Sequence, residues 1–314
     1  MTLPLGRPMR EIFGETVAAI ADDDPRVVML DGDVGSSTRA DILEKAHPDR
    51  YLQMGIAEQN MLGVAAGLTT MGLIPFISTF VSFAVVRPLD QIRVLIAQTG
   101  ANVKITPGYA GLFTGQTGMS HIIVDDLTIM RAMPGMVTVA PADDVEAAQV
   151  LRWAAAYHGP CYVRLVRDAT ARLFDDSYRF AFGKAVVVRD GRDVSLISTG
   201  TQTPRVVEAA ELLAAAGVDA HVLHVPTLKP LDVEAIVAAA KRTGRVITVE
   251  EHSIIGGLGG AVAETLAERH PTRVDRVGLR DIYPESGAND ALLEIYGLSA
   301  ARVSDQVRDL IGAA

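Results

Sequence analysis

The chain has 314 residues and a formal net charge of −9; 49% of its residues are hydrophobic and 21% are charged. The acidic balance argues against a nucleic-acid-binding protein, and no apolar run reaches the roughly 20 residues that span a membrane. Met1 to Arg10 lacks the apolar core of a signal peptide, and the single cysteine, Cys161, excludes an internal disulfide framework. The composition therefore predicts a cytoplasmic protein with a packed core, long enough for two domains.

Short apolar runs alternate with helical patterns through the first half of the chain. Strands are expected at Val27–Asp31, Leu73–Ile77, Val103–Thr106, Met136–Val139 and Cys161–Leu165. Helices are expected near Met9–Ala21, Ala57–Met71, Phe80–Thr99 and Ala142–Tyr157. Continuous apolar strands separated by helices are typical of a parallel sheet covered on both faces. Cys161, which opens the last strand, is interpreted as a core residue rather than a nucleophile.

The segment Asp168 to Lys184 is charged, aromatic and aperiodic, and it is interpreted as a linker. After it, short apolar runs again alternate with helical patterns. Further strands are expected at Val194–Thr199, Ala220–Val225, Val246–Glu251 and Val274–Leu279. Further helices are expected at Thr203–Ala216, Asp232–Lys241, Gly260–Arg269 and Ser299–Ile311. The sequence thus predicts two α/β domains, about residues 1–175 and about 185–314, each with a mostly parallel sheet flanked by helices.

Glu58 is the most unusual acidic residue of the first half. It lies in Gly55-Ile56-Ala57-Glu58-Gln59-Asn60-Met61, inside a segment of apolar and small residues. Glutamate is rarely buried unless it is paired or has a chemical task, so this one is a candidate proton carrier. The alternative is an ordinary acid at a helix N-terminus, placed there by the helix dipole.

Aromatic and glycine-rich segments supply further candidates. Phe80 and Phe83 are three residues apart, so a helix would place them on one face, either to stack on a flat ring or to pack in the core. The glycine-rich loop from Pro107 follows an expected strand and ends at His121. Parallel sheets bind ligands beyond the carboxyl ends of their strands, so this histidine is either a site residue or a structural one.

Other groups remain ambiguous without a fold. Arg10, Ser37 and Arg167 are far apart in sequence, and scattered surface arginines are the simpler interpretation. No Cys/His cluster has metal-ligand spacing. Gly32-Asp33 with Asn60 lacks the second glycine of a magnesium-diphosphate motif. Gly256 to Gly260 precedes a helix and is interpreted as a tight turn rather than as an anion or dinucleotide site.

Taken in order, these segments resemble the transketolase family of thiamine diphosphate enzymes. The motifs that carry the resemblance are Asp31-Gly32-Asp33 with Ser36-Ser37, Gly55 to Asn60, Thr79-Phe80-Val81-Ser82-Phe83, Gly115-x-x-Gly118-x-x-His121, Arg131 to Met136, Ala140 to Asp143, and Glu250 to Ser253 with Gly256 to Gly259. The resemblance covers nearly the whole chain, but only the pyrimidine-binding and C-terminal domains of a full-length transketolase.

The resemblance implies roles for the candidates. Glu58 would hydrogen-bond the aminopyrimidine of thiamine diphosphate and promote its imino tautomer, with Phe80 and Phe83 holding the ring. His121 would face the substrate and the reacting part of the cofactor. Arg10, Ser37 and Arg167 would hold the phosphate of a sugar phosphate, because an arginine fork binds phosphate with two hydrogen bonds.

Three positions depart from the family pattern. A third aromatic of the ring clamp is Val86, an acidic residue before the loop histidine is Thr117, and a histidine that assists phosphate binding is Tyr109. The substrate is therefore expected to differ from the standard sugar phosphates or to be held differently.

The resemblance further implies a two-component transketolase that transfers a two-carbon ketol unit between sugar phosphates. No motif for the Mg²⁺-diphosphate end of the cofactor is found, so an N-terminal pyrophosphate-binding subunit is expected to hold Mg²⁺, in a dimer of heterodimers. The alternatives are the β subunit of a 2-oxo acid dehydrogenase or decarboxylase, a deoxyxylulose phosphate synthase-like enzyme, and a non-catalytic assembly subunit.

Overall fold

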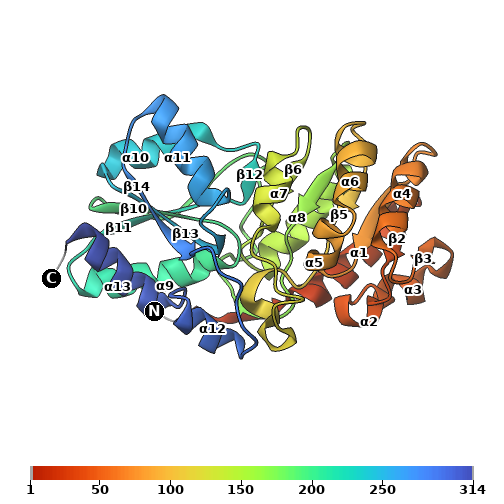
Figure 1. Ribbon diagram of the computed structural model, residues 1–314, viewed down its shortest axis with the longest axis horizontal. Helices are drawn as coiled ribbons and strands as arrows, with labels where there is room; N and C mark the ends of the chain where they lie inside the picture. The colour runs from red at the N-terminus through yellow and green to blue at the C-terminus, as the bar shows by residue number, and fades with distance from the viewer. Residues whose placement is uncertain (1–2, 313–314) are drawn as a thin grey trace.

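The computed structural model of the chain describes residues 3–312, which form two lobes side by side (Figure 1). The first lobe holds a seven-stranded sheet in the order β12-β6-β7-β5-β4-β2-β3. Its strands are β2 (Val27–Asp31), β3 (Tyr51–Gln53), β4 (Ile74–Ser78), β5 (Lys104–Ile105), β6 (Val137–Val139), β7 (Cys161–Val163) and β12 (Thr227–Lys229). All pair in parallel except β12, which runs antiparallel to β6.

Helices cover the first sheet. They are α1 (Met9–Asp23), α2 (Gly35–Thr38), α3 (Asp41–Ala46), η1 (Pro48–Arg50), α4 (Glu58–Thr69), α5 (Val81–Val86), α6 (Leu89–Gln91), η2 (Ile92–Ala97), η3 (Gly111–Thr117), α7 (Asp126–Ala132) and α8 (Asp144–Ala156). Every residue of β2 and β4 is buried, as expected of central strands covered on both faces. Cys161 is buried in β7, which confirms its interpretation as a core residue.

The second lobe holds a five-stranded sheet in the order β14-β13-β10-β11-β9. Its strands are β9 (Val186–Arg189), β10 (Val194–Ser198), β11 (Ala220–His224), β13 (Val246–Ser253) and β14 (Val274–Leu279), and only β9 is antiparallel. Its helices are α9 (Gln202–Ala215), α10 (Val233–Thr243), α11 (Leu258–Arg269), α12 (Asn289–Ile295) and α13 (Ala300–Ile311). The predicted fold class, two mostly parallel sheets flanked by helices, is confirmed.

One strand crosses from the second half of the chain to the first lobe. β12 comes from the second half of the chain but completes the first sheet, where the Ala140 amide also donates to the Pro226 carbonyl at 2.8 Å. β1 (Leu5–Pro8) pairs with β8 (Ala169–Ala171) in a separate two-stranded sheet. The boundaries 1–175 and 185–314 stay a prediction. Within residues 3–312, no helix is long and apolar enough to cross a membrane.

The single helix predicted over Phe80–Thr99 is wrong. Phe80 is extended (φ −83°, ψ 145°) and precedes α5, which ends at Val86. Pro88 has no amide hydrogen to continue the ladder, so α5 ends before it, although Arg87 keeps helical dihedral angles (φ −62°, ψ −48°). The chain then restarts as α6 and widens into the π-helix η2. The break places Arg87 at a corner, close to the start of α4.

A candidate active site between the two lobes

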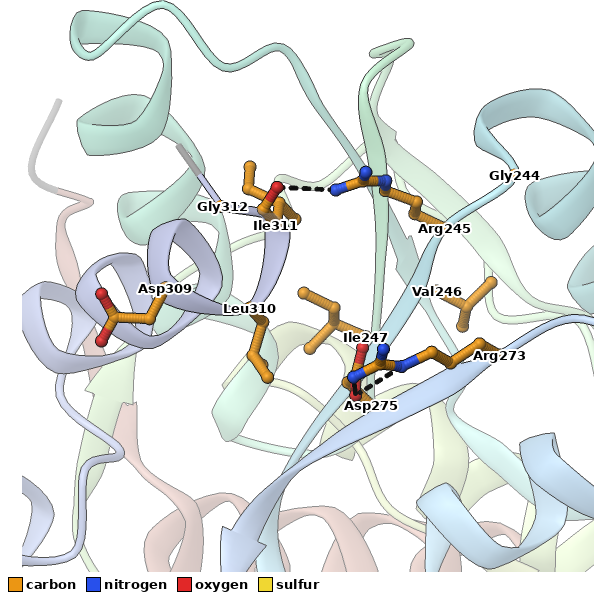
Figure 2. Close-up of a pocket in the computed structure, with 10 residues that line it drawn as sticks. All are labelled: Gly244, Arg245, Val246, Ile247, Arg273, Asp275, Asp309, Leu310, Ile311 and Gly312. Atoms are coloured by element: carbon orange, nitrogen blue, oxygen red, sulfur yellow. Dashed lines mark hydrogen bonds and ion pairs between the residues drawn. The ribbon is translucent and has the colours of Figure 1, made fainter. Parts of the chain in front are cut away.

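Two hollows in the structure deserve comparison. One, of about 460 Å³, lies where β13 and β14 begin, against the end of α13 (Figure 2). Its arginines already have partners, since Arg245 donates to the Ile311 carbonyl at 2.8 Å and Arg273 pairs with Asp275 at 2.9 Å. Because parallel sheets bind ligands at the carboxyl ends of their strands, this amino-terminal edge is a poor candidate for an active site.

The other hollow, of about 580 Å³, lies between the lobes. Its lining residues are Leu5, Ser37, Phe80, Tyr109, Phe113, Thr114, Gln116, Thr117, Arg167, Asp168, Ala169, Ala288, Asn289 and Asp290. Ser37, Phe80, Tyr109 and Arg167 follow β2, β4, β5 and β7, so they extend from the carboxyl ends of neighbouring parallel strands. This is the position at which open α/β sheets bind their ligands.

Glu58 begins α4 and is 3% exposed. It is not the lone acid that the sequence suggested, because Arg87 Nη1 donates to its Oε1 at 2.8 Å. Gln59 Nε2 holds the Arg87 carbonyl at 3.2 Å. The Arg87 guanidinium also lies 3.9 Å from the centroid of the Phe83 ring, on its face. The flat guanidinium of Arg87 thus contacts both the buried carboxylate and the face of Phe83, which belongs to an aromatic wall made of Phe80, Phe83 and His121.

The rings of Phe80, Phe83 and His121 lie close together. The centroids of the two phenylalanine rings are 5.8 Å apart, and the His121 ring lies 5.7 Å from Phe80 and 5.0 Å from Phe83. Ser120 Oγ lies 2.9 Å from His121 Nδ1, and Nε2 makes no hydrogen bond to residues 3–312. Val86 is exposed and supplies no third side to this aromatic clamp.

The glycine-rich loop is fixed from the second lobe. Glu251 Oε1 accepts from the Leu112 amide at 2.7 Å, and Glu251 Oε2 accepts from Arg205 at 3.1 Å. Asn289 Oδ1 accepts from the Gly115 amide at 3.1 Å. A Cβ at Gly111 would lie 2.3 Å from Glu251 Oε1, and its φ is +63°, so only glycine fits there. The second lobe therefore sets the shape of the loop that carries His121.

Of the expected anion-binding groups, Ser37 and Arg167 line the same hollow together with Tyr109, whereas Arg10 adjoins them through its backbone and is not a lining residue. The Arg10 amide donates to the Arg167 carbonyl at 3.4 Å. Tyr109 Oη accepts from Arg167 Nε at 3.1 Å and donates to the Ser37 carbonyl at 3.3 Å. The Tyr109 ring packs 4.1 Å from Phe80, which joins these groups to the aromatic wall.

Asp31 fixes the start of α2, the short helix that contains Ser37. Its carboxylate accepts from the amides of Val34 and Gly35, each at 3.0 Å, and from Ser78 Oγ at 2.8 Å. These bonds hold the first turn of α2 against β4. The Asp31-Gly32-Asp33 motif is therefore structural support for the hollow, and Ser37 follows from it.

The Glu250 to Ser253 motif is buried structural support as well. Glu250 accepts from the amides of Leu258 at 2.7 Å and Gly259 at 2.8 Å, at the start of α11. Burial raises the pKa of Glu250 to about 7, and burial lowers the pKa of its neighbour His252 to about 4. Because Glu250 already occupies these amides, Gly256 to Gly260 forms a strand-to-helix turn, as interpreted, and offers nothing to a dinucleotide.

Sequence reasoning missed three residues of the site: Arg87, Asp168 and Asn289. The Arg87-Pro88 pair inside a predicted helix was a usable signal for a corner. Asn289 Nδ2 donates to Asp168 Oδ2 at 3.1 Å across 121 positions of sequence, and no local pattern predicts such a contact.

Comparisons with known proteins identify the family and the fold. The pyrimidine binding domain of transketolase matches residues 6–172, and the transketolase C-terminal domain matches residues 183–303. The chain is 40% identical over 304 residues to a putative transketolase C-terminal section of Methanocaldococcus jannaschii, covering 96% of this chain and 95% of that protein. It is 39% identical over 295 residues to a 6-deoxy-6-sulfo-D-fructose transketolase subunit of Clostridium sp., covering 94% and 92%.

A solved structure described as "Split gene transketolase, inactive beta4 tetramer" matches with a TM-score of 0.89 and 41% identity, covering 98% of this chain and 99% of that one. Human transketolase is 33% identical over 306 residues, which are 96% of this chain but 49% of the human protein. The chain therefore belongs to the transketolase family and corresponds to the C-terminal section of its split members.

Proposed function

We propose that this chain supplies the pyrimidine-binding half of a thiamine diphosphate site that transfers a two-carbon ketol unit between sugars with an anionic end group, such as sugar phosphates. The observation that carries the proposal is the buried Glu58 carboxylate, which Arg87 links to the face of Phe83 in the wall of Phe80, Phe83 and His121. A carboxylate near the face of an aromatic ring is what a flat nitrogen heterocycle requires.

The residues present fit the aminopyrimidine of thiamine diphosphate. Arg87 shows that a planar group bearing N–H donors can lie on Phe83 and reach Glu58 at hydrogen-bond distance. When bound, the cofactor supplies the nucleophilic carbon for ketol transfer. Glu58 would hold and exchange a proton with a ring nitrogen, and the low exposure of its carboxylate would keep water from competing.

The remaining residues would act on the sugar. His121, beside Phe83 and with its Nδ1 near Ser120 Oγ, would use Nε2 to hydrogen-bond a substrate hydroxyl and to move its proton. Arg10, Ser37 and Arg167 would receive the far end of the sugar.

Arg87 would have to release Glu58 before the cofactor binds, because both need the same carboxylate. The exposures favour this exchange: the Arg87 side chain is 43% exposed and can move into water, whereas Glu58 is 3% exposed and fixed by α4. The chain by itself would therefore hold its pyrimidine site closed.

A second chain would hold the diphosphate and Mg²⁺. Split relatives described as transketolase sections and subunits support this arrangement. α4 offers a surface for a partner, since a Cβ at Gly67 would meet nothing within 4 Å and one at Gly63 only Leu95 at 4.0 Å. We propose that this small-residue face packs in a dimer of heterodimers, with active sites between chains.

The test is reconstitution with an N-terminal transketolase section, thiamine diphosphate and Mg²⁺, followed by an assay across ketose and aldose phosphates. Ketol transfer is expected from the mixture and not from the chain alone. Transfer by the lone chain contradicts partner dependence. Pyruvate decarboxylation without ketol transfer favours the 2-oxo acid enzymes, and failure of thiamine diphosphate to bind any complex favours a non-catalytic subunit.

A further inference from the structure

Arg167 has only one nitrogen without a partner among residues 3–312. Its Nε donates to Tyr109 Oη at 3.1 Å, and its Nη1 donates to Asp168 Oδ1 at 2.6 Å, which leaves Nη2. Two-point binding of phosphate by arginine uses two neighbouring nitrogens. Two of the three guanidinium nitrogens of Arg167 thus already donate to side chains of this chain.

Asp168 is held beside Arg167 and cannot easily turn away. Its second carboxylate oxygen accepts from Asn289 Nδ2 at 3.1 Å, and Asn289 is itself fixed by the Gly115 amide and the Phe113 carbonyl. The carboxylate therefore remains at the hollow when a ligand enters, where it would repel an anion.

Tyr109 is equally fixed. Its φ is +71°, a left-handed conformation that few residues other than glycine adopt. The ring is 5% exposed and packed against Phe80, and its hydroxyl is held between Ser37 and Arg167. Such a constrained residue indicates a place that is shaped for function.

Arg10, Arg167 and Asp168 together carry one net positive charge. Arg167 lines the subsite and Arg10 adjoins it through its amide, and the carboxylate of Asp168 offsets one of these two positive charges. The Arg10 side chain makes no hydrogen bond or ion pair to residues 3–312, and its buried Nε lacks an acceptor. Asp290, an exposed carboxylate, lines the same hollow. A dianion would leave at least one negative charge unbalanced.

We propose that Tyr109 and Asp168 set the specificity of this subsite for a sugar whose far end carries a single negative charge, such as a sulfonate, over one ending in a phosphate dianion. The inference rests on the proposed ketol transfer and narrows its substrate class. Tyr109 and Asp168 act on specificity by limiting Arg167, and Arg10 and the free Nη2 of Arg167 bind the anion.

The test compares fructose 6-phosphate with 6-deoxy-6-sulfofructose as ketol donors for the reconstituted complex between pH 5.5 and 7.5. The sulfonate keeps one charge throughout, whereas the phosphate loses its second proton with a pKa near 6. The ratio of kcat/KM for phosphate to that for sulfonate is expected to rise as pH falls, by up to about twentyfold, because the monoanion fraction grows. Because both donors are acted on by the same enzyme, dividing kcat/KM for the phosphate by kcat/KM for the sulfonate cancels pH effects that come from the enzyme's own titrating groups.

Two variants test the named residues. Asp168→Asn keeps the shape and the contact with Asn289 but removes a charge, so the phosphate-to-sulfonate ratio at pH 7.5 is expected to rise on the order of tenfold. Tyr109→Phe keeps the ring on Phe80 and frees Arg167 Nε, which shifts the ratio in the same direction. Asp290→Asn is the matched comparison, since Asp290 lines the hollow without touching Arg167, and a smaller shift is expected.

Binding gives an independent readout. Because these residues all belong to this chain, calorimetric titration of the complex with the two sugars in the absence of thiamine diphosphate is expected to show the same preference. A ratio that falls with falling pH, or one that Asp168→Asn leaves unchanged, overturns the inference while ketol transfer stands. Absence of transfer from any sugar refutes the proposed function itself, and with it this inference.

Discussion

Arg87 donates a 2.8 Å hydrogen bond to the buried carboxylate of Glu58, the residue expected to activate the cofactor. The same guanidinium covers the face of Phe83, so Arg87 makes both contacts that a pyrimidine ring would make. Cofactor binding and the Arg87–Glu58 pair are therefore mutually exclusive in the proposed account.

Replacing Arg87 should make the cofactor bind more tightly. If only a fraction of the molecules has Glu58 free, the apparent affinity is reduced by that fraction, so Arg87→Ala in the reconstituted complex should bind thiamine diphosphate about three- to tenfold more tightly. Titration followed by circular dichroism or fluorescence measures this. Arg93→Ala is the control, because Arg93 is a nearby arginine whose ion pair with Asp90 is exposed to solvent. Weaker binding by Arg87→Ala would mean that Arg87 holds the cofactor instead.

The same variant should lower stability in the absence of cofactor. Removal of the guanidinium leaves a buried carboxylate without its partner, and about 1–2 kcal/mol of unfolding free energy should be lost, less than for a fully buried pair because Arg87 is 43% exposed. Urea unfolding of the lone chain measures the loss. An unchanged midpoint would show that the pair contributes nothing in solution.

Glu250 and His252 should give opposite pH dependences of stability. The pKa of Glu250 is raised from 4.5 to about 7, so its folded form keeps a proton that the unfolded form loses, and stability falls as pH rises through this window. The pKa of His252 is lowered from 6.5 to about 4, so the unfolded form binds the extra proton and stability rises with pH. The two slopes should largely offset each other between about pH 4.5 and 6.5.

Glu250→Gln should reveal the pH dependence of stability that His252 causes. Its unfolding free energy should rise by about 2–3 kcal/mol between pH 4.5 and 6.5, whereas His252→Gln should show a fall over the same range. Urea unfolding at several pH values measures both. Parallel pH profiles for the two variants would contradict the assignment of opposite shifts.

Gly67→Ala should separate folding from assembly. Gly67 lies exposed within α4, and a Cβ there meets nothing, so alanine should stabilise the lone chain by up to about 1 kcal/mol through helix propensity. If α4 packs against a partner, the added methyl group should weaken assembly, as measured by analytical ultracentrifugation with the N-terminal section. Gly260→Ala in α11 is the control, because its Cβ would make only ordinary contacts at 3.8 Å and 3.9 Å. Equal effects of both variants on assembly would place the interface elsewhere.

Much of the fold and part of the site could be predicted because their signals are local. The buried run Val27–Asp31 forms β2 with the predicted bounds, because a short continuous apolar run is typical of a fully buried strand. The aromatic wall and His121 followed from ordered motifs. The short edge strand β12 and the contact between Asp168 and Asn289 could not be predicted, because they depend on how distant segments meet. The continuous helix predicted over Phe80–Thr99 overlooked Pro88, whose low helix propensity signals the break.

Hydrogen–deuterium exchange at C2 of bound thiamine diphosphate tests most directly whether Glu58 activates the cofactor. The measurement compares the native complex with one that carries Glu58→Gln, after circular dichroism has shown that both fold alike. The proposed role predicts slower exchange in the variant by about 10²- to 10⁴-fold, the range expected when a positioned acid–base group is lost. Exchange at the native rate in a cofactor-loaded Glu58→Gln complex would contradict it.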